Sequence, residues 1–184
     1  MDSLVIVDCQ YDFIDGSLAC SGSHEAVAYL INFINRHEME VLYTSDWHSP
    51  ANRSFKVNGG IWPIHCVAGE KGSALDRHFF ADIIDVKNRP NEENIFHKGM
   101  DDIVEEYSAF HGINKKGIPL GTMVTDHVYV GGIASEYCVE ETVFELLKAG
   151  HKVTLLVKGL GYVDYNGHLA AIDAMKKLGV EILE

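Results

Sequence analysis

The regular alternation of apolar runs with stretches of helical period limits what this chain can fold into. Ser3–Val7 and Val41–Ser45 are short, largely apolar runs of strand character, whereas Ala26–Asn35 carries its apolar residues at helical spacing. A helix that connects two such strands forms a βαβ unit, in which the strands are parallel. The first quarter of the chain therefore predicts a parallel pair of strands.

The same pattern continues to the end of the chain. It predicts further strands over Ile83–Val86, Ile95–His97, Val128–Gly132, Val153–Val157 and Val180–Leu183. It also predicts helices over Tyr137–Leu147 and His168–Lys177, ended by Gly150 and Gly179. Strands that are apolar throughout indicate a parallel sheet covered on both faces. We therefore expect a three-layer α/β/α fold with a mostly parallel sheet of about six strands, which is a Rossmann-like architecture.

The length of the chain indicates how many domains it forms, and its charge indicates which classes of partner it can bind. The chain has 184 residues, 47% of them hydrophobic, which is enough for one domain over residues 1–184 with a two-sided core. A formal net charge of −12 opposes binding to nucleic acid or to an anionic membrane surface. No apolar run approaches the roughly 18 residues of a membrane span. We expect no nucleic-acid and no membrane partner, and the sequence leaves open whether the protein is a homo-oligomer.

The cysteines and the start of the chain suggest a compartment. The four cysteines, at positions 9, 20, 66 and 138, show no paired C-x-x-C spacing. The first residues lack the basic and long apolar regions of a signal peptide. Free thiols in a reducing cytoplasm fit these observations best.

One long segment, residues 46–70, has no clear period and is rich in His, Trp, Asn, Gly and Pro. Long irregular segments in compact domains are usually functional. Asp46 and His48 stand two residues apart, and His65 could complete a set of metal ligands across the loop. Such mixed oxygen and nitrogen ligands suit Zn²⁺, Mn²⁺ or Fe²⁺ with water in the open positions. The alternative is that Asp46 caps a turn before Ser49-Pro50 and that the histidines are ordinary polar loop residues.

Polar residues directly follow several predicted strands: Asp8, Asp46, Lys98 and Cys138. Ligands of open α/β sheets bind beyond the carboxyl ends of the strands, so the fold would bring these residues to one edge. A thiol at a helix start is favoured as thiolate, a nearby cation lowers its pKa further, and a carboxylate can accept its proton. Taken singly, Cys138 is more often a small buried hydrophobe and Lys98 a surface residue, whereas Asp8 could equally be a turn residue.

Six segments of the chain, in this order, carry a family resemblance. They are Asp8-Cys9-Gln10-Tyr11-Asp12-Phe13, Asp46-Trp47-His48-Ser49-Pro50, Trp62-Pro63-Ile64-His65-Cys66-Val67-Ala68-Gly69, Lys98-Gly99, Tyr107-Ser108-Ala109-Phe110 and Gly131-Gly132-Ile133-Ala134-Ser135-Glu136-Tyr137-Cys138-Val139. Together they resemble the nicotinamidase/pyrazinamidase group of the isochorismatase-like cysteine hydrolases. The resemblance spans about residues 4 to 157.

The resemblance implies roles for individual residues. Asp8, Lys98 and Cys138 would form the catalytic triad. Asp46, His48 and His65 would bind the metal. A non-proline cis peptide bond would join Ile133 to Ala134, and the N–H groups of Ala134 and Cys138 would form the oxyanion hole. Phe13, Trp62 and Tyr137 would form aromatic walls around the substrate.

The implied reaction is the hydrolysis of nicotinamide to nicotinic acid and ammonia through a thioester on Cys138, as in NAD salvage, with pyrazinamide as a further substrate. A metal ion, Zn²⁺ ahead of Fe²⁺ or Mn²⁺, would orient the pyridine ring. Two other functions compete with this one. An amidase for carbamoyl or ureido substrates would need no metal, and a flavodoxin-like binding module would need no triad.

The chain also departs from the family pattern. Tyr11 stands where the first motif normally has Asn, a change that could reshape the mouth of the pocket or its hydrogen bonds. A fourth protein ligand to the metal would come from Asn52, Ser54 or Asn58, although three protein ligands plus waters are the simpler expectation. The other histidines are interpreted as helix-face, strand-end or surface residues: His24, His37, His78, His97, His111, His127, His151 and His168.

Overall fold

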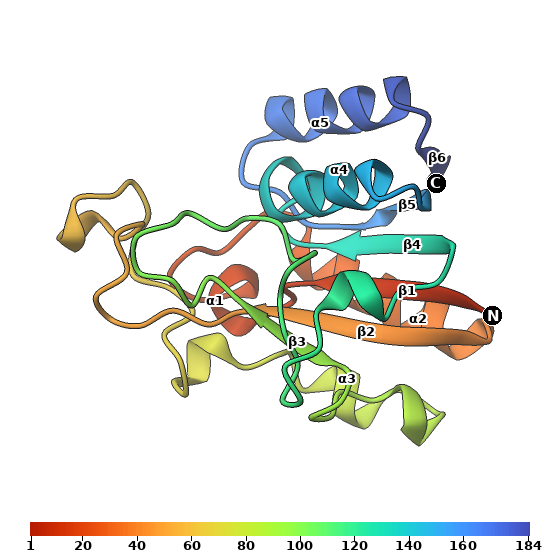
Figure 1. Ribbon diagram of the computed structural model, residues 1–184, viewed down its shortest axis with the longest axis horizontal. Helices are drawn as coiled ribbons and strands as arrows, with labels where there is room; N and C mark the ends of the chain where they lie inside the picture. Colours follow the sequence, from red (N-terminus) through yellow and green to blue (C-terminus); the bar gives the residue numbers. More distant parts are fainter.

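A computed structural model describes residues 1–184 and contains one six-stranded sheet with the order β3-β2-β1-β4-β5-β6 (Figure 1). Every pair of neighbouring strands is parallel. The strands are β1 Asp2–Val7, β2 Met39–Asp46, β3 Ile95–Lys98, β4 His127–Gly132, β5 Lys152–Leu160 and β6 Glu181–Leu183. The predicted three-layer α/β fold is thereby confirmed.

Helices cover both faces of this sheet. They are α1 Tyr11–Ile14, α2 Ser23–Arg36, α3 His78–Ala81, α4 Glu140–Lys148 and α5 Tyr165–Lys177. Single 3₁₀ turns occupy Lys56–Asn58 (η1), Lys71–Ser73 (η2), Val86–Asn88 (η3) and Leu120–Thr122 (η4), and a π-helical turn, η5, covers Ser135–Val139. None of the helices combines the length and the apolar character that crossing a membrane requires.

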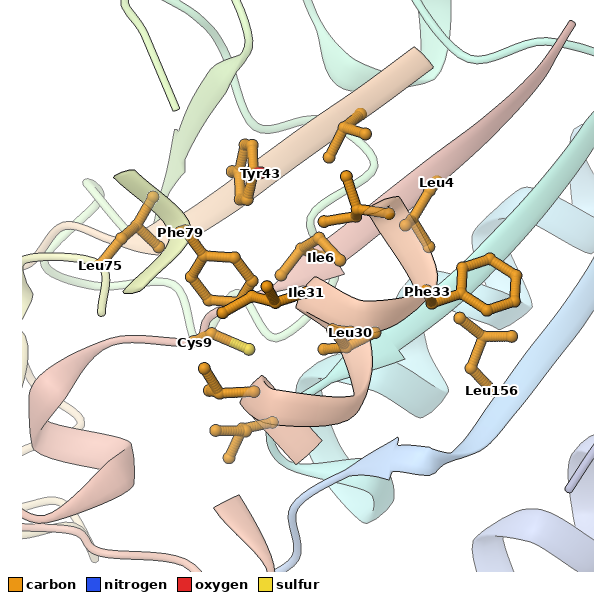
Figure 2. Close-up of a cluster of buried hydrophobic side chains, with 14 of the residues drawn as sticks. Leu4, Ile6, Cys9, Leu30, Ile31, Phe33, Tyr43, Leu75, Phe79 and Leu156 are labelled. Carbon is orange, nitrogen blue, oxygen red and sulfur yellow. The ribbon is translucent and has the colours of Figure 1, made fainter. Parts of the chain in front are cut away.

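Side-chain alternation along β1 divides the core into two halves. Leu4 and Ile6 face α2 and pack with Leu30 and Tyr43, as Figure 2 shows. Val5 and Val7 point to the opposite face, where they belong to the cluster built on α4 and α5. Because successive side chains of a strand point to opposite faces, an uninterrupted apolar strand requires this burial on both sides.

The strand order places a crevice between β1 and β4. From β1 the chain first builds β2 and β3 on one side and then crosses to build β4, β5 and β6 on the other. Such a reversal is the point at which open α/β sheets bind ligands, beyond the carboxyl ends of the strands. The loops that follow β2 and β3 extend from this end of the sheet (Figure 1). Asp8 directly follows β1, and Asp46 and Lys98 are the last residues of β2 and β3.

The predicted strand at Ile83–Val86 is wrong. This segment forms turns that lead into η3, and only Ile83 is buried, whereas Ile84 and Val86 are 77% and 69% exposed. Its backbone pairs with side chains instead of a neighbouring strand: the Ile84 N–H donates to Asn35 Oδ1, and Ile83 O accepts from Arg89 Nε. One buried residue anchors the segment, and a short apolar run alone does not distinguish that arrangement from a strand.

Candidate active site

Asp8, Lys98 and Cys138 come together at the carboxyl edge of the sheet. The Lys98 Nζ atom lies 3.0 Å from Asp8 Oδ2 and 3.4 Å from Cys138 Sγ. All three side chains are buried, Cys138 retaining 6% exposure. A thiol, a carboxylate and an amine thus share one site from which most water is excluded.

The turn after β1 holds Asp8 in its orientation. Asp8 has a left-handed backbone with φ 47°, a conformation that Asp tolerates better than most residues. Thr44 Oγ1, from the adjacent β2, donates to Asp8 Oδ1 at 2.6 Å. Asp8 Oδ2 faces Lys98 and receives no hydrogen bond from any other group. One carboxylate oxygen is therefore fixed, and the other is available to accept a proton.

Burial sets the ionisation of the thiol. Burial raises the pKa of Cys138 well above its ordinary value near 9, Lys98 opposes the rise, and the carboxylates of Asp8 and Asp46 add to it. Burial likewise raises the pKa of Asp8, against the effect of Lys98. The sequence-based expectation of a lowered thiol pKa is wrong in its net direction, because desolvation exceeds the attraction of the single ammonium group.

The segment before Cys138 places a hydrogen-bond donor beside the thiol. The Ile133–Ala134 peptide bond is cis, and the Ala134 N–H donates to no other group of the protein. Ala134 and Cys138 both line the same pocket. Cys138 itself lies inside η5, which continues directly into α4. The backbone near the sulfur can therefore donate to an oxygen bound in the pocket.

Asp46, His48 and His65 form a set of metal-ligand side chains. Their ligand atoms all lie within 4.8 Å of one another, with His48 Nε2 and His65 Nε2 at 3.4 and 4.0 Å from Asp46 Oδ2. Ligands at about 2.1 Å from a tetrahedral ion stand roughly 3.4 Å apart, so these spacings fit a common ion.

Carbonyl groups hold both imidazoles in the orientation that metal binding needs. His48 Nδ1 bonds Gly99 O at 2.7 Å, and His65 Nδ1 bonds Pro63 O at 2.8 Å. When each Nδ1–H donates in this way, each Nε2 keeps its lone pair for a metal. The residues present therefore fit a divalent metal ion.

Asp46 links the metal-ligand set to the triad. Its Oδ1 accepts from Lys98 Nζ at 2.5 Å, while its Oδ2 faces the two imidazoles. Burial raises the pKa of Asp46, but Lys98 and His48 together hold it below its ordinary range. Gln10 fixes the backbone of Asp46 with two hydrogen bonds of 2.8 Å. Asp46 is therefore a carboxylate that serves both parts of the site.

The three candidates for a fourth ligand differ in their hydrogen bonds. Asn52 Nδ2 donates to Asp101 O, and its Oδ1 accepts from Ser54 N. Asn58 Nδ2 donates to Pro50 O and Asn52 O. Ser54 Oγ is buried and has no hydrogen-bond partner. Both asparagines thus stabilise the loop, and a fourth ligand from Ser54 stays a prediction.

Aromatic side chains line the pocket above these groups. Phe13, Trp62 and Tyr137 all belong to its wall, and the rings of Trp62 and Tyr137 meet edge to face at 5.0 Å. Trp62 Nε1 also donates to Tyr107 OH at 3.1 Å, which joins the loop after β2 to the loop after β3. The three aromatic residues singled out in the sequence therefore face one cavity.

Sequence reasoning missed part of this wall. The pocket is also lined by Leu18, Cys20, Glu105, Glu106, Tyr107 and Val163. Tyr107 lies in one of the six segments that carry the family resemblance, and its place there could have marked it as a pocket residue. The others are single residues of irregular loops, where no periodicity marks the inward-facing positions.

Tyr11 does not contribute to the pocket wall. Its hydroxyl accepts from the Arg77 N–H at 3.1 Å, and Lys71 Nζ lies 5.6 Å from the centre of its ring. The side chain turns toward residues 71–77, and an effect of Tyr11 on the pocket mouth or its hydrogen bonds stays a prediction.

A three-layer α/β fold with a thiol, a carboxylate and an amine at one sheet edge is what an α/β cysteine hydrolase requires. The chain belongs to the isochorismatase family, since the Isochorismatase domain matches residues 2–184. It is 31% identical over 195 aligned positions to the nicotinamidase/pyrazinamidase of Mycobacterium tuberculosis, covering 100% of this chain and 98% of that protein.

Solved structures agree with this assignment. The pyrazinamidase of Pyrococcus horikoshii in complex with zinc superposes with a TM-score of 0.82 at 30% identity, over 99% of this chain and 98% of that one. The yeast nicotinamidase bound to the inhibitor nicotinaldehyde superposes with a TM-score of 0.84 at 25% identity, over 100% of both chains.

Proposed function

We propose that this protein is a nicotinamidase, which hydrolyses nicotinamide to nicotinic acid and ammonia. The observation that carries the proposal is that Cys138 lines the same aromatic-walled pocket as the three metal-ligand residues, while its sulfur contacts Lys98, which in turn pairs with Asp8. Relatives named nicotinamidase or pyrazinamidase match the whole chain at about 30% identity. A binding module without enzymatic activity would not need a buried thiol, carboxylate and amine in contact with one another, so this alternative does not explain the site.

The first half of the reaction forms a thioester. Asp8 Oδ2 accepts the Cys138 proton as the sulfur attacks the carboxamide carbon, because the resting thiol is protonated. The Ala134 and Cys138 N–H groups donate to the oxygen as it becomes negative, an effect of roughly 3 kcal/mol per donor. Asp8 then returns the proton to the departing nitrogen, and ammonia leaves.

The second half hydrolyses the thioester. A water attacks the acyl carbon, Asp8 accepts a proton from it and passes that proton to the departing sulfur, and nicotinic acid leaves and loses its own proton to the solvent. Lys98 stays protonated through both halves, since Asp46 and Asp8 raise its pKa although burial acts the other way. Its positive charge balances whichever of Asp8 and Cys138 is negative.

Asp46, His48 and His65 would hold the metal, with Zn²⁺ the best match to their nitrogen and oxygen donors. When bound, the ion would supply an open coordination position for the ring nitrogen of the substrate. Phe13, Trp62 and Tyr137 would contact the ring faces and edges. Pyrazinamide has a ring nitrogen at the same distance from its carboxamide, so it is a second substrate. The product nicotinic acid would enter NAD salvage.

Ammonia release from nicotinamide tests the proposal directly. We expect turnover by the metal-loaded protein and a loss of at least about a thousandfold in kcat for Cys138→Ala and Cys138→Ser, as for other covalent nucleophiles. An unchanged Tm and metal content would show that both variants are folded. Unchanged turnover in Cys138→Ala would refute thioester chemistry, and turnover of only carbamoyl or ureido substrates would favour the competing amidase.

A further inference from the structure

A second buried network lies behind the turn that carries the nucleophile. Ser135, the first residue of η5, is fully buried, and its Oγ lies 2.8 Å from His168 Nδ1 and 3.0 Å from Glu136 Oε2. His168 belongs to α5 and is 8% exposed. No part of the proposed reaction uses these three side chains.

The number of protons that these three side chains carry determines which of them donates in each hydrogen bond. A serine hydroxyl has one proton, and the Glu136 carboxylate can only accept, so Ser135 donates to Glu136. The remaining contact then requires His168 Nδ1 to carry a proton and to donate to Ser135 Oγ. Burial lowers the pKa of His168 against the effect of Glu136, and the lowered pKa favours the neutral ring. The chain of bonds thus runs from His168 through Ser135 to Glu136.

The same carboxylate also fixes the loop between β5 and α5. Glu136 Oε1 accepts from the N–H groups of Val163 and Asp164 at 2.8 and 2.7 Å. Val163 lines the pocket, and Asp164 caps α5 by accepting from the Gly167 N–H. The pocket wall, the start of α5 and η5 are therefore closed into one hydrogen-bonded ring.

This ring of hydrogen bonds lies directly beside one of the proposed oxyanion donors, the Ala134 N–H. Ser135 directly follows Ala134, and the Ser135 N–H donates to Gly161 O at 2.9 Å. Both the backbone bond to Gly161 and the side-chain bonds of Ser135 therefore hold the chain just after Ala134, while the Ile133 N–H, which donates to Val7 O at 2.9 Å, holds it just before. The ring of His168 is in turn held by stacking on Tyr162, at 4.6 Å and 28° between planes.

We infer that His168 is a positioning residue, which acts through Ser135 to align the Ala134 N–H with the oxygen of the reacting amide. This inference rests on the proposed function. A misplaced donor weakens binding of the transition state but leaves ring binding intact, so the loss falls on kcat. His168 lies outside the pocket wall and contacts none of the reacting groups.

The test compares His168→Ala with His168→Asn. The Asn side chain keeps an N–H donor close to the position of Nδ1, whereas Ala removes it. For His168→Ala we expect kcat for nicotinamide to fall about ten- to a hundredfold, with the Kd of nicotinate within about threefold of the wild type. His168→Asn should retain kcat within about threefold. Ser135→Ala, which leaves α5 unchanged, should reproduce the loss.

Nicotinaldehyde provides a second readout. The Cys138 sulfur would add to its carbonyl carbon, the thiol proton would pass to Asp8, and the carbonyl oxygen would become an alkoxide at the oxyanion position. We expect its affinity to fall with kcat in His168→Ala, while nicotinate affinity does not change. The inference would be overturned if all three variants lost Tm, nicotinate affinity and nicotinaldehyde affinity together. It would also be overturned if kcat were unchanged in His168→Ala. Failure of the wild type to release ammonia would instead refute the proposed function.

Discussion

At the scale of single residues, Cys138 lies between two groups of opposite charge in a site that excludes water. Lys98 Nζ contacts its sulfur, and the Asp8 carboxylate shares the same lysine. Lys98 lowers the pKa of the thiol and the carboxylates of Asp8 and Asp46 raise it, so these charges oppose one another in setting its protonation state. Desolvation therefore decides it, and the pKa of Cys138 is raised.

This ionisation predicts how the thiol reacts with iodoacetamide in the metal-depleted protein. Only the thiolate is alkylated, and its fraction grows about tenfold per pH unit as long as the pH is below the pKa. Because burial raises that pKa, the rate at Cys138 should rise continuously from pH 7 to pH 9 without a plateau. Mass spectrometry of the peptide that carries Cys138 measures the rate. Cys138→Ala gives the background from the three other buried cysteines. A plateau below pH 8 would show that the resting group is a thiolate.

The sequence predicted which residues meet here better than it predicted their ionisation. Asp8, Lys98 and Cys138 each end or follow an apolar strand, and the parallel fold then brings them to one edge. The net pKa of the thiol depends on how completely the other segments exclude water, which no local pattern records. His168 shows the same limit: its place on a helix was expected, but not its contact with Ser135.

At the scale of elements, two glycines of the sheet leave room for a side chain of α2 that packs on them. A Cβ atom at Gly131 in β4 would lie 2.7 Å from Leu30 Cδ2, and one at Gly159 in β5 would lie 2.8 Å from the same atom. Leu30 is fully buried and lies in the centre of the cluster in Figure 2. The fit of α2 on the sheet thus depends on one leucine and two glycines.

A double-mutant cycle tests this contact. Leu30→Ala should lower the free energy of unfolding by about 3 kcal/mol through the cavity that it leaves. Gly131→Ala should lower the free energy of unfolding by about 2 kcal/mol through overpacking. The double variant should lose about 1 kcal/mol less than the sum of the two single losses, because the shortened side chain on α2 makes room for the added methyl group. Denaturant unfolding gives all the values.

Gly150→Ala is the matched control for this cycle. Gly150 has φ 94° and no neighbour within 4 Å of an added Cβ, so its cost of about 1 kcal/mol comes from the backbone alone and should add to that of Leu30→Ala. Full additivity at Gly131 as well would contradict the packing argument.

Periodicity predicted the elements well wherever they are long. The helices at 26–35 and 168–177 were placed within three residues of their observed ends, at Ser23–Arg36 and Tyr165–Lys177. The helix predicted from Tyr137 is in fact a π-helical turn that leads into α4, a change of hydrogen bonding that residue spacing alone does not reveal. At Ile83–Val86 the short run could not be distinguished from a turn.

At the scale of the whole molecule, the metal-ligand set connects the sheet to the long irregular loop. Asp46 is the last residue of β2, whereas His65 lies near the far end of the 46–70 segment, where the only regular element is η1. The composition of this segment indicated function, but its path could not be derived from local propensity, because side chains hold it in place. Ser49 Oγ, for example, donates to Asp102 Oδ1 in the loop after β3.

Metal binding should therefore stabilise the entire fold. A ligand that binds only the folded state contributes about 2.7 kcal/mol at a hundred times its Kd. For a chain of this length each kcal/mol raises Tm by about 2–4 °C, so saturating Zn²⁺ should raise the Tm of the metal-depleted protein by about 5–10 °C. Differential scanning calorimetry with and without Zn²⁺ measures the shift, and Mg²⁺ should give little, since imidazole ligands suit it poorly.

Two histidine variants make this prediction specific. His65→Ala removes one ligand from the set and should abolish most of the Zn²⁺-dependent rise in Tm. His24→Ala removes an exposed histidine of α2, outside the set, and should leave the rise unchanged. An equal rise in both variants would mean that Zn²⁺ binds elsewhere on the protein. In that case Asp46, His48 and His65 would serve only to hold Lys98 and the loop, and substrate orientation would have to come from the aromatic walls alone.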